Sequence, residues 1–505
     1  MLLEKDVLAP FPAEVAIPAR QVADAMASSG AGYQRVLVVL DDDPTGTQSV
    51  ADLPVLTRWE AEDFGWAFEH IAQSGCGPAV YVLTNTRSLD PGEAASRNEE
   101  VVRNALAAAG SSAGGDGALR LAFVSRSDST LRGHYPLEPD VIAATVAEVS
   151  GERTDGVVLV PAFPDAGRVT VGGVHYLRGT GDSAGQLTPA SETEFARDAS
   201  FGFSTSTMAQ YVEEKSHGRY AADSVITLDL GTIRAGARAS GGDPSISATA
   251  IADAISGASD STPIVADIVT ENDLRALALG LEESERRGKK LLYRVGPPFV
   301  RARIGQDIRS QLTSDEAYAD ATPSAAGGLI VVGSHVGQTT RQLTVLLKQH
   351  SSAHIVEIDV EQLLAAGDDV ARFLDEIVAT VVESLRGGDV IVHTSRLLIK
   401  TGDPVESLRI ARAVSSAVVT VVNRTLKTFP PRFVIAKGGI TSSDVAAFGL
   451  EIRHAIVRGP MLPGIVSLWE PMDGPAKGIP YVVFAGNVGD DDSLAQVTRK
   501  LSNTF

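Results

Sequence analysis

The sequence predicts an α/β protein made of two three-layer domains, each with a mainly parallel sheet. Short runs of β-branched and other apolar residues alternate along the chain with longer Ala-rich segments of helical character. This alternation is typical of βαβ units. A stretch rich in Gly, Pro, Ser and Ala, 320–328, separates two such series. Many of the apolar runs end directly in polar loops, so we expect a ligand cleft between the two domains.

The strands of the first series are expected at 35–40, 79–84, 119–125, 156–161, 224–228 and 263–266. The first four end in polar loops, which are 41–48, 85–88, 126–134 and 161–168. Because the carboxyl ends of parallel strands share one edge of a sheet, these loops should line one crevice. The segment 234–247, rich in Gly, Ala and Ser, is expected to be a mobile loop.

The strands of the second series are expected at 329–332, 354–358, 389–392, 433–436 and 481–484, with an amphipathic helix at 404–426. The chain is therefore divided into an N-terminal extension, 1–32, a first domain, 33–320, and a second domain, 328–505.

The net charge and the pattern of apolar residues exclude several classes of partner. The chain has 505 residues and a net charge of -19, which argues against nucleic acid or an anionic membrane as a partner. Its first residues lack the pattern of a secretory signal, and no apolar run approaches the roughly 20 residues of a membrane span. We expect a soluble cytoplasmic protein, with a homodimer as the default assembly. The one cysteine, Cys76, is expected to be a passive thiol rather than part of a disulfide or zinc cluster.

The acidic run Asp41-Asp42-Asp43 follows an apolar strand and precedes a Pro-Thr-Gly turn. Adjacent carboxylates repel one another, so this strand end needs a cation, a substrate hydroxyl or a proton. Asp42 and Asp43 are the candidate catalytic residues, because one of them can take the proton from a hydroxyl that attacks phosphorus. The plainer alternative is a solvated acidic turn that caps a helix.

The other loops of the first domain carry guanidinium and hydroxyl donors beside a further acid. The candidate substrate-binding residues are Arg87, Asp128, Ser129, Thr130, Arg132 and Arg168. Arg side chains bind carboxylates through two parallel hydrogen bonds, and Asp accepts from sugar hydroxyls. The set therefore suits a small polyhydroxylated carboxylate, although any one of these Arg residues is more often a surface ion pair.

The second domain has three glycine-bearing turns after strands, 333–340, 437–444 and 485–490. Such turns can place backbone N–H groups around a phosphate, and Thr441 or Ser442 can cap the following helix. Each turn alone is equally compatible with an ordinary strand-to-helix connection. No His pair suggests a transition-metal site, and the metal ligands stay unknown. Mg²⁺ held mainly by nucleotide phosphates and a carboxylate is compatible with the sequence.

From about Arg35 onward the chain resembles the four-carbon acid sugar kinase family, as a divergent branch. The similar motifs in the first half are Asp42-Asp43-Pro44-Thr45-Gly46, Asp128-Ser129-Thr130-Leu131-Arg132-Gly133, Pro161-Ala162-Phe163-Pro164 and Gly167-Arg168. Those in the second half are Gly333-Ser334, Gly438-Gly439-Ile440-Thr441 and Gly486-Asn487-Val488-Gly489.

The resemblance implies an N-terminal sugar-acid domain and a C-terminal nucleotide domain. Phosphate would pass in line from ATP, with Mg²⁺, to the terminal hydroxyl of a tetronate or 3-oxo-tetronate. The residues implied for ATP are Ser334, Gly438, Gly439, Thr441, Gly486 and Asn487. Those implied for the sugar acid include Asp42 and Asp43 together with the substrate-binding set above.

The chain departs from the family pattern at several positions. Phe484 and Ala485 stand where the family has Lys-Ser, and Ile440 replaces Glu. A missing lysine removes a charge near the phosphates, and Lys437 and Lys477 are the candidates to replace it. Two alternatives stay open: a non-catalytic module that binds nucleotide or sugar acid, and another sugar-acid enzyme such as a phosphatase or aldolase. Which Asp is the base and which sugar acid is used are also open.

Overall fold

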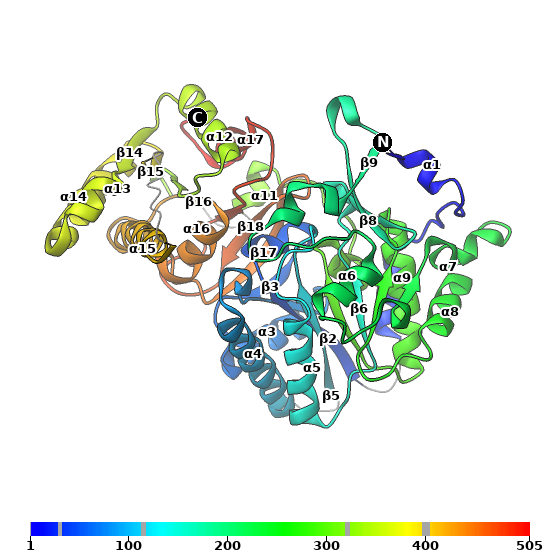
Figure 1. The fold of residues 1–505 in the computed structure, drawn as a ribbon. Helices are drawn as coiled ribbons and strands as arrows, with labels where there is room; N and C mark the ends of the chain where they lie inside the picture. Colours follow the sequence, from blue (N-terminus) through cyan, green and yellow to red (C-terminus); the bar gives the residue numbers. More distant parts are fainter. Residues whose placement is uncertain (1, 29–32, 113–117, 319–323, 396–403) are drawn as a thin grey trace. The chain divides into compact units, whose positions relative to one another are not determined.

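The computed structural model describes residues 2–28, 33–112, 118–318, 324–395 and 404–505 (Figure 1). The chain forms two compact units. The first contains Met1–Gly46 and Trp59–Ile308, and the second contains Thr47–Arg58 and Arg309–Phe505. None of the described helices combines the length and apolar character needed to span a membrane.

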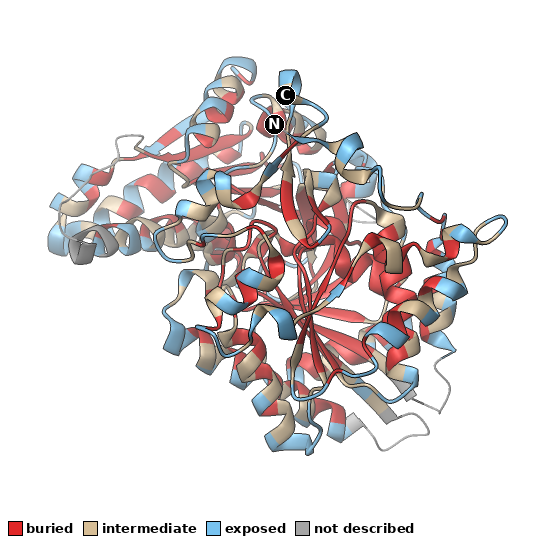
Figure 2. Ribbon diagram, turned by 45° about the vertical axis from the view of Figure 1, so that its right-hand side comes forward, coloured by how far each residue is buried: buried red, intermediate tan, exposed pale blue. Residues whose placement is uncertain are grey.

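The first unit is built on a parallel sheet with the strand order β10-β11-β6-β12-β5-β2-β4. Its strands are β2 (Tyr33–Asp41), β4 (Ala79–Leu83), β5 (Ala118–Arg126), β6 (Gly156–Val160), β10 (Ile226–Leu228), β11 (Thr262–Ala266) and β12 (Leu291–Val295). The central strands are buried (Figure 2). Burial on both faces explains why they read as continuous apolar runs rather than alternating ones.

Two groups of helices pack beside this sheet. One group consists of α3 (Ala61–Ser74), α4 (Pro91–Ser112) and α5 (Leu137–Ser150). The other consists of α2 (Ala19–Ala27), α7 (Leu230–Ile233), α8 (Pro244–Ala254), α9 (Glu271–Arg286) and α10 (Pro298–Arg303). Sheet and helices thus form the predicted α/β layers (Figure 1).

The N-terminal residues belong to the first unit. β1 (Leu2–Leu3) pairs with β9 (Gln186–Pro189) at the edge of a small sheet that continues through β8 (Val174–Arg178) and β7 (Arg168–Val171). Helix α1 (Glu4–Leu8) follows β1, and α6 (Met208–Lys215) follows the small sheet. Helix α2 packs on α9, and the Ile17 N–H donates to Asn272 Oδ1 at 3.0 Å.

Two expectations for the first half were incomplete or wrong. The expected strands omitted β12, which lies between β5 and β6 at the centre of the sheet. The expected mobile loop 234–247 instead holds a 3₁₀ turn and the start of α8, whose first turn is capped by the Asp243 carboxylate. Arg234 is buried in an ion pair with Asp273, with 2.7 Å between Nε and Oδ1, which fixes the segment.

The second unit has a mixed sheet with the order β3-β17-β18-β19-β16-β13-β15-β14. The strands are β3 (Leu53–Leu56), β13 (Leu329–Val332), β14 (His354–Ile358), β15 (Val390–Thr394), β16 (Val434–Lys437), β17 (His454–Leu462), β18 (Val466–Pro471) and β19 (Tyr481–Phe484). The five strands from β19 to β14 are parallel, and the remaining three pair antiparallel. The sequence did not predict β3, β17 or β18.

The helices of the second unit are α11 (Ser314–Tyr318), α12 (Gly337–Gln349), α13 (Val360–Ala365), α14 (Val370–Leu385), α15 (Pro404–Thr428), α16 (Gly439–Asp444) and α17 (Ser493–Leu501). Helices α12 and α17 pack on each other, and so do α14 and α15. The core includes Phe433, Phe484, Leu343 and Leu494, all at most 3% exposed. This core holds the strand ends that carry the glycine turns.

The segment 47–58 leaves the first unit and joins the second. Strand β3 pairs with β17, and the buried Trp469 donates its indole N–H to Thr47 Oγ1 at 2.9 Å. The chain therefore passes between the units at 46–47, 58–59 and 308–309. The domain limits 33–320 and 328–505 stay a prediction, as does a ligand cleft between the domains.

Candidate active site

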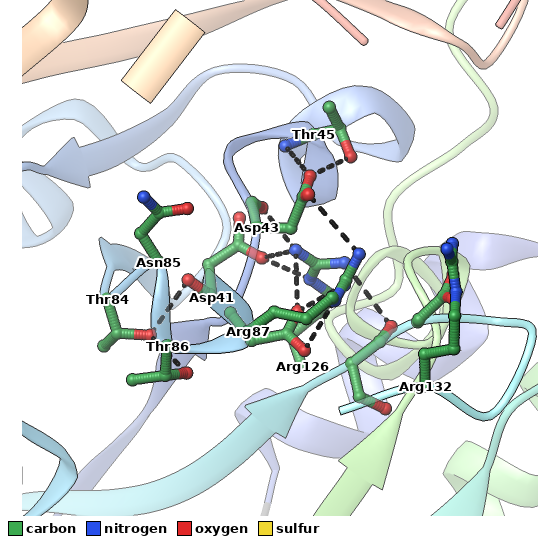
Figure 3. Close-up of polar contacts among 12 residues, drawn as sticks. Asp41, Asp43, Thr45, Thr84, Asn85, Thr86, Arg87, Arg126 and Arg132 are labelled. Atoms are coloured by element: carbon green, nitrogen blue, oxygen red, sulfur yellow. Dashed lines mark hydrogen bonds and ion pairs between the residues drawn. The ribbon is translucent and has the colours of Figure 1, made fainter. Parts of the chain in front are cut away.

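The loops that follow β2, β4 and β5 meet at one edge of the first sheet (Figure 3). Arg126, the last residue of β5, is 2% exposed and binds the Asp41 carboxylate at the end of β2. Its Nη2 also donates to the Asp43 carbonyl oxygen and lies 3.3 Å from Asp42 Oδ1. One buried guanidinium thus contacts all three residues of the acidic run.

Arg87 binds the same acids from the turn after β4 (Figure 3). Its Nη2 lies 2.6 Å from Asp42 Oδ1 and its Nε 3.2 Å from Asp42 Oδ2. Its Nη1 lies 3.3 Å from Asp43 Oδ2. Arg87 therefore holds Asp42 through two parallel hydrogen bonds and reaches Asp43 with its remaining nitrogen.

The three acids differ in environment. Burial raises the pKa of Asp41 to about 7, with Arg126 opposing, and burial also raises the pKa of Asp42. For Asp43 burial again raises the pKa, but Arg87, Arg126 and the hydrogen bonds from Thr45 outweigh it, so the pKa is lowered. The Asp43 side chain is 23% exposed, against 2% for Asp42. Asp43 is thus the ionised acid of the run that remains accessible.

Two glycines make this packing possible. A Cβ on Gly46 would lie 2.2 Å from Asp41 Oδ1 and 2.4 Å from Arg126 Nε. Gly133 has φ +119°, and a Cβ there would lie 2.7 Å from Arg294 Nη2 and 3.0 Å from Asp42 Oδ2. Both glycines belong to motifs that the sequence singled out, and their role is close packing against the acids and the Arg side chains beside them.

Asp128 and Arg132 form a second ion pair beside the first. Asp128 Oδ2 accepts from Arg132 Nε at 2.5 Å and also from the Thr130 hydroxyl. Burial raises the pKa of Asp128, but Arg87 and Arg132 outweigh it and hold the pKa well below its usual range. The effect of Arg87 on Asp128 shows that the two ion pairs share one electrostatic environment.

Arg168 and Ser129 lie at the edge of this cluster. Arg168 Nη1 donates to the Ala166 carbonyl oxygen at 2.5 Å, and its Nε is buried without a hydrogen-bond partner in the described chain. Burial lowers the pKa of Arg168, and the charges of Asp128 and Arg132 also act on it. The carbonyl oxygen of Ser129 lies 2.8 Å from His175 Nε2. The predicted substrate residues are therefore brought together, with Arg168 linked through charge rather than a direct contact.

Sequence reasoning missed the support beneath these loops. Glu138 on α5 binds Arg294 of β12 and accepts a hydrogen bond from Thr86, and Arg294 Nη1 donates to Ser125 Oγ at 2.7 Å. Arg126 was missed as well, although it lies two residues before Asp128. Glu138 and Arg294 gave no signal because isolated charges in a helix and in an unpredicted strand look like surface residues.

In the second unit, the loops after β13, β16 and β19 converge. A Cβ on Gly438 would lie 2.8 Å from Thr441 Oγ1 and 3.1 Å from Ser334 Cβ. A Cβ on Gly486 would lie 2.7 Å from Ser334 Oγ. The structure thus brings together Ser334, Gly438, Thr441 and Gly486. Gly439 begins α16, and Asn487 follows Gly486.

Helix α12 fixes the last of these loops. Thr339 Oγ1 donates to the Gly486 carbonyl oxygen at 2.9 Å. Gln342 Nε2 donates to the carbonyl oxygens of Val488 at 2.9 Å and Asp490 at 2.7 Å. These two residues were missed because a hydroxyl and an amide on a helix carry no local sign of a distant partner.

The expected cap of α16 was wrong. The helix begins at Gly439, with Gly438 at the N-cap position and no side-chain cap. Thr441 and Ser442 lie inside the helix, and Ser442 Oγ donates back to the Ala436 carbonyl oxygen at 2.7 Å. The φ of +134° at Gly438 turns the chain so sharply that the helix starts before either hydroxyl residue.

The described residues contain no group of three or more His, Cys, Asp or Glu side chains arranged for a metal ion. Asp42 and Asp43 are engaged by Arg87, as shown above. Mg²⁺ keeps several waters and binds through one or two carboxylates and phosphates. These residues fit Mg²⁺ only as an ion carried mainly by nucleotide phosphates, and Mg²⁺ stays a prediction.

Comparison with known families gives two matches along the chain. Residues 37–303 match a sugar-binding N-terminal domain, and residues 329–494 match a nucleotide-binding C-terminal domain. A D-erythronate kinase from Heliobacterium modesticaldum is 23% identical over 494 residues, which cover 92% of this chain and 98% of the relative. The two matched domains fall on the two loop clusters described above.

Two solved structures share the fold. A proposed tRNA synthase from Salmonella typhimurium LT2 superposes with a TM-score of 0.64 at 16% identity, covering 93% of this chain and all of the other. A Haemophilus influenzae protein superposes with a TM-score of 0.58 at 16% identity, covering 92% of this chain and 99% of the other. At this identity they support the fold alone.

Proposed function

Because the chain belongs to the four-carbon acid sugar kinase family, we propose that it transfers phosphate from ATP to the terminal hydroxyl of a tetronate or 3-oxo-tetronate. The observation that carries the proposal is the presence in one chain of a carboxylate and guanidinium cluster at strand ends and of three converging glycine loops. D-Erythronate is the first substrate to test, since the relative that matches nearly the whole chain is a D-erythronate kinase.

Arg132 and Arg168 are proposed to bind the carboxylate of the sugar acid. Arg87 and Arg126 are already committed to the acidic run through several contacts each. Arg132 uses only its Nε on Asp128 and Thr130, and Arg168 Nε has no partner in the described chain. Their remaining donors suit the two oxygens of a carboxylate. The Ser129 and Thr130 hydroxyls are proposed to contact the sugar hydroxyls.

Asp43 is proposed to accept the hydrogen bond of the attacking hydroxyl, with Asp42 as the residue that fixes Arg87. The lowered pKa of Asp43 keeps it ionised at neutral pH, and the Thr45 N–H, 3.0 Å from Oδ1, sets the direction of the carboxylate. In phosphoryl transfer such a residue acts mainly by positioning the nucleophile. An ionised, oriented and accessible acid fits that role better than the buried Asp42.

The second unit is proposed to hold ATP. Glycine at 438, 439 and 486 lets the backbone approach the phosphates, and the Ser334 and Thr441 hydroxyls and the Asn487 amide add donors. Mg²⁺ would neutralise part of the charge on the phosphates. The cytoplasmic location and the homodimer stay predictions.

The test is ADP release by the purified protein with ATP and Mg²⁺, over tetronates, 3-oxo-tetronates and related four- to six-carbon sugar acids. ADP release that depends on one of these acids is the expected result. No ADP release over the whole panel, despite measured ATP binding, would instead support a binding module. Release of phosphate from phosphorylated sugar acids without ATP would indicate a phosphatase, and formation of an aldehyde an aldolase.

A further inference from the structure

Lys437 is a buried cation beneath the glycine loops of the second unit. It is the last residue of β16 and is 0% exposed. Its strand lies between β13 and β19, with Val332 and Phe484 as the register partners of Lys437. The side chain is therefore enclosed at the end of the sheet from which all three loops leave.

The ammonium group has few partners. Nζ donates to the Ala485 carbonyl oxygen at 2.5 Å and lies 3.9 Å from the centre of the Phe484 ring. In the part of the chain that the structure describes, no carboxylate forms an ion pair with it. An ammonium has three N–H donors, and burial without a counter-charge is costly. Burial lowers the pKa of Lys437 to about 7.

The position of Lys437 connects it to two of the loops. Gly438 follows it directly, and the Gly438 N–H donates to the Phe484 carbonyl oxygen at 2.8 Å. Ala485, which accepts from Nζ, directly precedes Gly486. An anion held by the Gly438 and Gly486 loops would supply the negative charge that the described residues do not place near Lys437.

We propose that Lys437 is a positioning residue of the nucleotide site, whose ammonium holds the Ala485 carbonyl and balances the charge of the phosphates bound above it. The inference rests on the proposed function. Its consequence is that nucleotide binding takes up a proton, because a bound polyphosphate favours the charged lysine. Affinity should then fall as pH rises above about 7, where the unliganded lysine becomes neutral.

Other titratable groups lie on the neighbouring elements. Tyr481 of β19 donates to the Ser442 carbonyl oxygen at 2.5 Å, and burial raises its pKa further above neutrality. Asp444 of α16 accepts from the Ser415 hydroxyl, and burial raises its pKa. His335 lies in the loop after β13 and His393 in β15. The test therefore compares variants at Lys437 itself rather than relying on the pH profile of the wild type.

The experiment is calorimetric titration with ADP and excess Mg²⁺ at pH 7 and 8, in buffers of different ionisation enthalpy. The variants are Lys437→Met and Lys437→Arg, with Lys348→Met, at an exposed lysine in the last turn of α12, as the matched control. We expect the wild type and the control to take up roughly half a proton at pH 7 and more at pH 8. Lys437→Met should bind ADP about tenfold more weakly than the wild type at pH 7, and its binding should take up fewer protons. Lys437→Arg should keep the charge, bind at least tenfold more tightly than Lys437→Met, and lose the proton uptake.

The outcomes separate this inference from the proposed function. If Lys437→Met binds ADP with the wild-type Kd and the wild-type proton uptake, the role of Lys437 is overturned while the nucleotide site stands. If Lys437→Arg is as weak as Lys437→Met although thermal unfolding shows it folded, shape rather than charge matters and the inference is wrong. If the wild type binds neither ADP nor ATP, the proposed function fails and this inference fails with it.

Discussion

The two loop clusters handle charge in opposite ways. In the first unit, acids and guanidinium groups face one another, so Asp42 and Asp43 are engaged by Arg87 before any ligand is present. In the second unit the loops offer glycine backbone and hydroxyl groups, with Lys437 buried beneath them. The first cluster thus balances its own charge, whereas the second leaves a charge for a ligand to balance. Loss of charge should therefore destabilise the first unit and stabilise the second.

The largest effect is expected from Arg126→Met. This change leaves Asp41 and Asp42 buried with one cation fewer, and breaking a buried ion pair by removing one partner costs about 3 to 5 kcal/mol. Urea unfolding should show a loss of stability of that size. The control is Arg287→Met, which removes the more exposed pairs with Asp253 and Glu283 and should cost less than about 1 kcal/mol. Equal losses in the two variants would show that the first cluster does not depend on its own charge balance.

The next effect concerns activity. Asp43→Asn removes the accessible carboxylate that orients the attacking hydroxyl and should lower kcat by more than roughly tenfold, while nucleotide binding is unchanged. Its control is Asp253→Asn at an exposed ion pair on α8, which should retain wild-type kcat. Steady-state kinetics and nucleotide titration measure both quantities. Full activity of Asp43→Asn would assign the role to another residue.

A stabilising effect is expected from Lys437→Met. The pKa of this lysine falls from 10.5 to about 7 on folding, so the protonated form is disfavoured in the folded state. The resulting destabilisation of the wild type is complete below pH 7 and is relieved as pH rises toward 10.5. At about 1.4 kcal/mol per pKa unit this destabilisation is at most roughly 4 kcal/mol at pH 7 and roughly 2 kcal/mol at pH 9. In Lys437→Met, loss of the hydrogen bond to Ala485 and of the Phe484 ring contact offsets part of the gain. Without nucleotide, Lys437→Met should therefore be more stable than the wild type by about 2 kcal/mol at pH 7 and close to the wild type at pH 9. Urea unfolding at the two pH values tests this, and a variant less stable than the wild type at pH 7 would contradict it.

The smallest effect is expected from Gly486→Ala. The added Cβ would lie 2.7 Å from Ser334 Oγ, so that this side chain must shift. We expect a loss of nucleotide affinity of several-fold, about 1 kcal/mol, with little change in thermal stability. Gly387→Ala is the matched control in the same unit, since its Cβ would meet nothing closer than the Ser384 carbonyl oxygen at 3.7 Å. If the two variants bind nucleotide equally well, the loops do not need to approach so closely.

The parallel strands and the polar loops at their ends could be predicted from the sequence, because strands covered on both faces are continuously apolar. Strand β12 could not, since Arg294 interrupts its short apolar run and Lys289 and Lys290 directly precede it. Inside the protein, Arg294 is balanced by Glu138 from a distant helix. In the sequence alone, a charged residue whose ion-pair partner is far along the chain cannot be told from a surface residue.

The candidate site shows the same limit. The loops around Asp42 and Asp128 in the first unit, and those around Ser334 and Gly438 in the second, were predicted from motifs, and within each unit the structure brings the loops together. The roles of Arg126 and Thr339 were not predicted, because their partners are set by strand order and by helix packing. Strand β3 was missed for a related reason: four apolar residues do not say which sheet they will join.

Because residues 47–58 belong to the second unit, this unit needs a strand that is synthesised long before the rest of it. Strand β3 emerges early from the ribosome, yet its partner β17 is made only near the end of the chain, where Leu56 pairs with His454. The second sheet cannot be completed until then, because the pairing of β3 with β17 must wait for residues 454–457. For the same reason a gene fragment for residues 309–505 would leave one edge of β17 bare and prone to aggregation. We therefore expect the two units to be encoded and expressed together in one chain rather than as separate proteins.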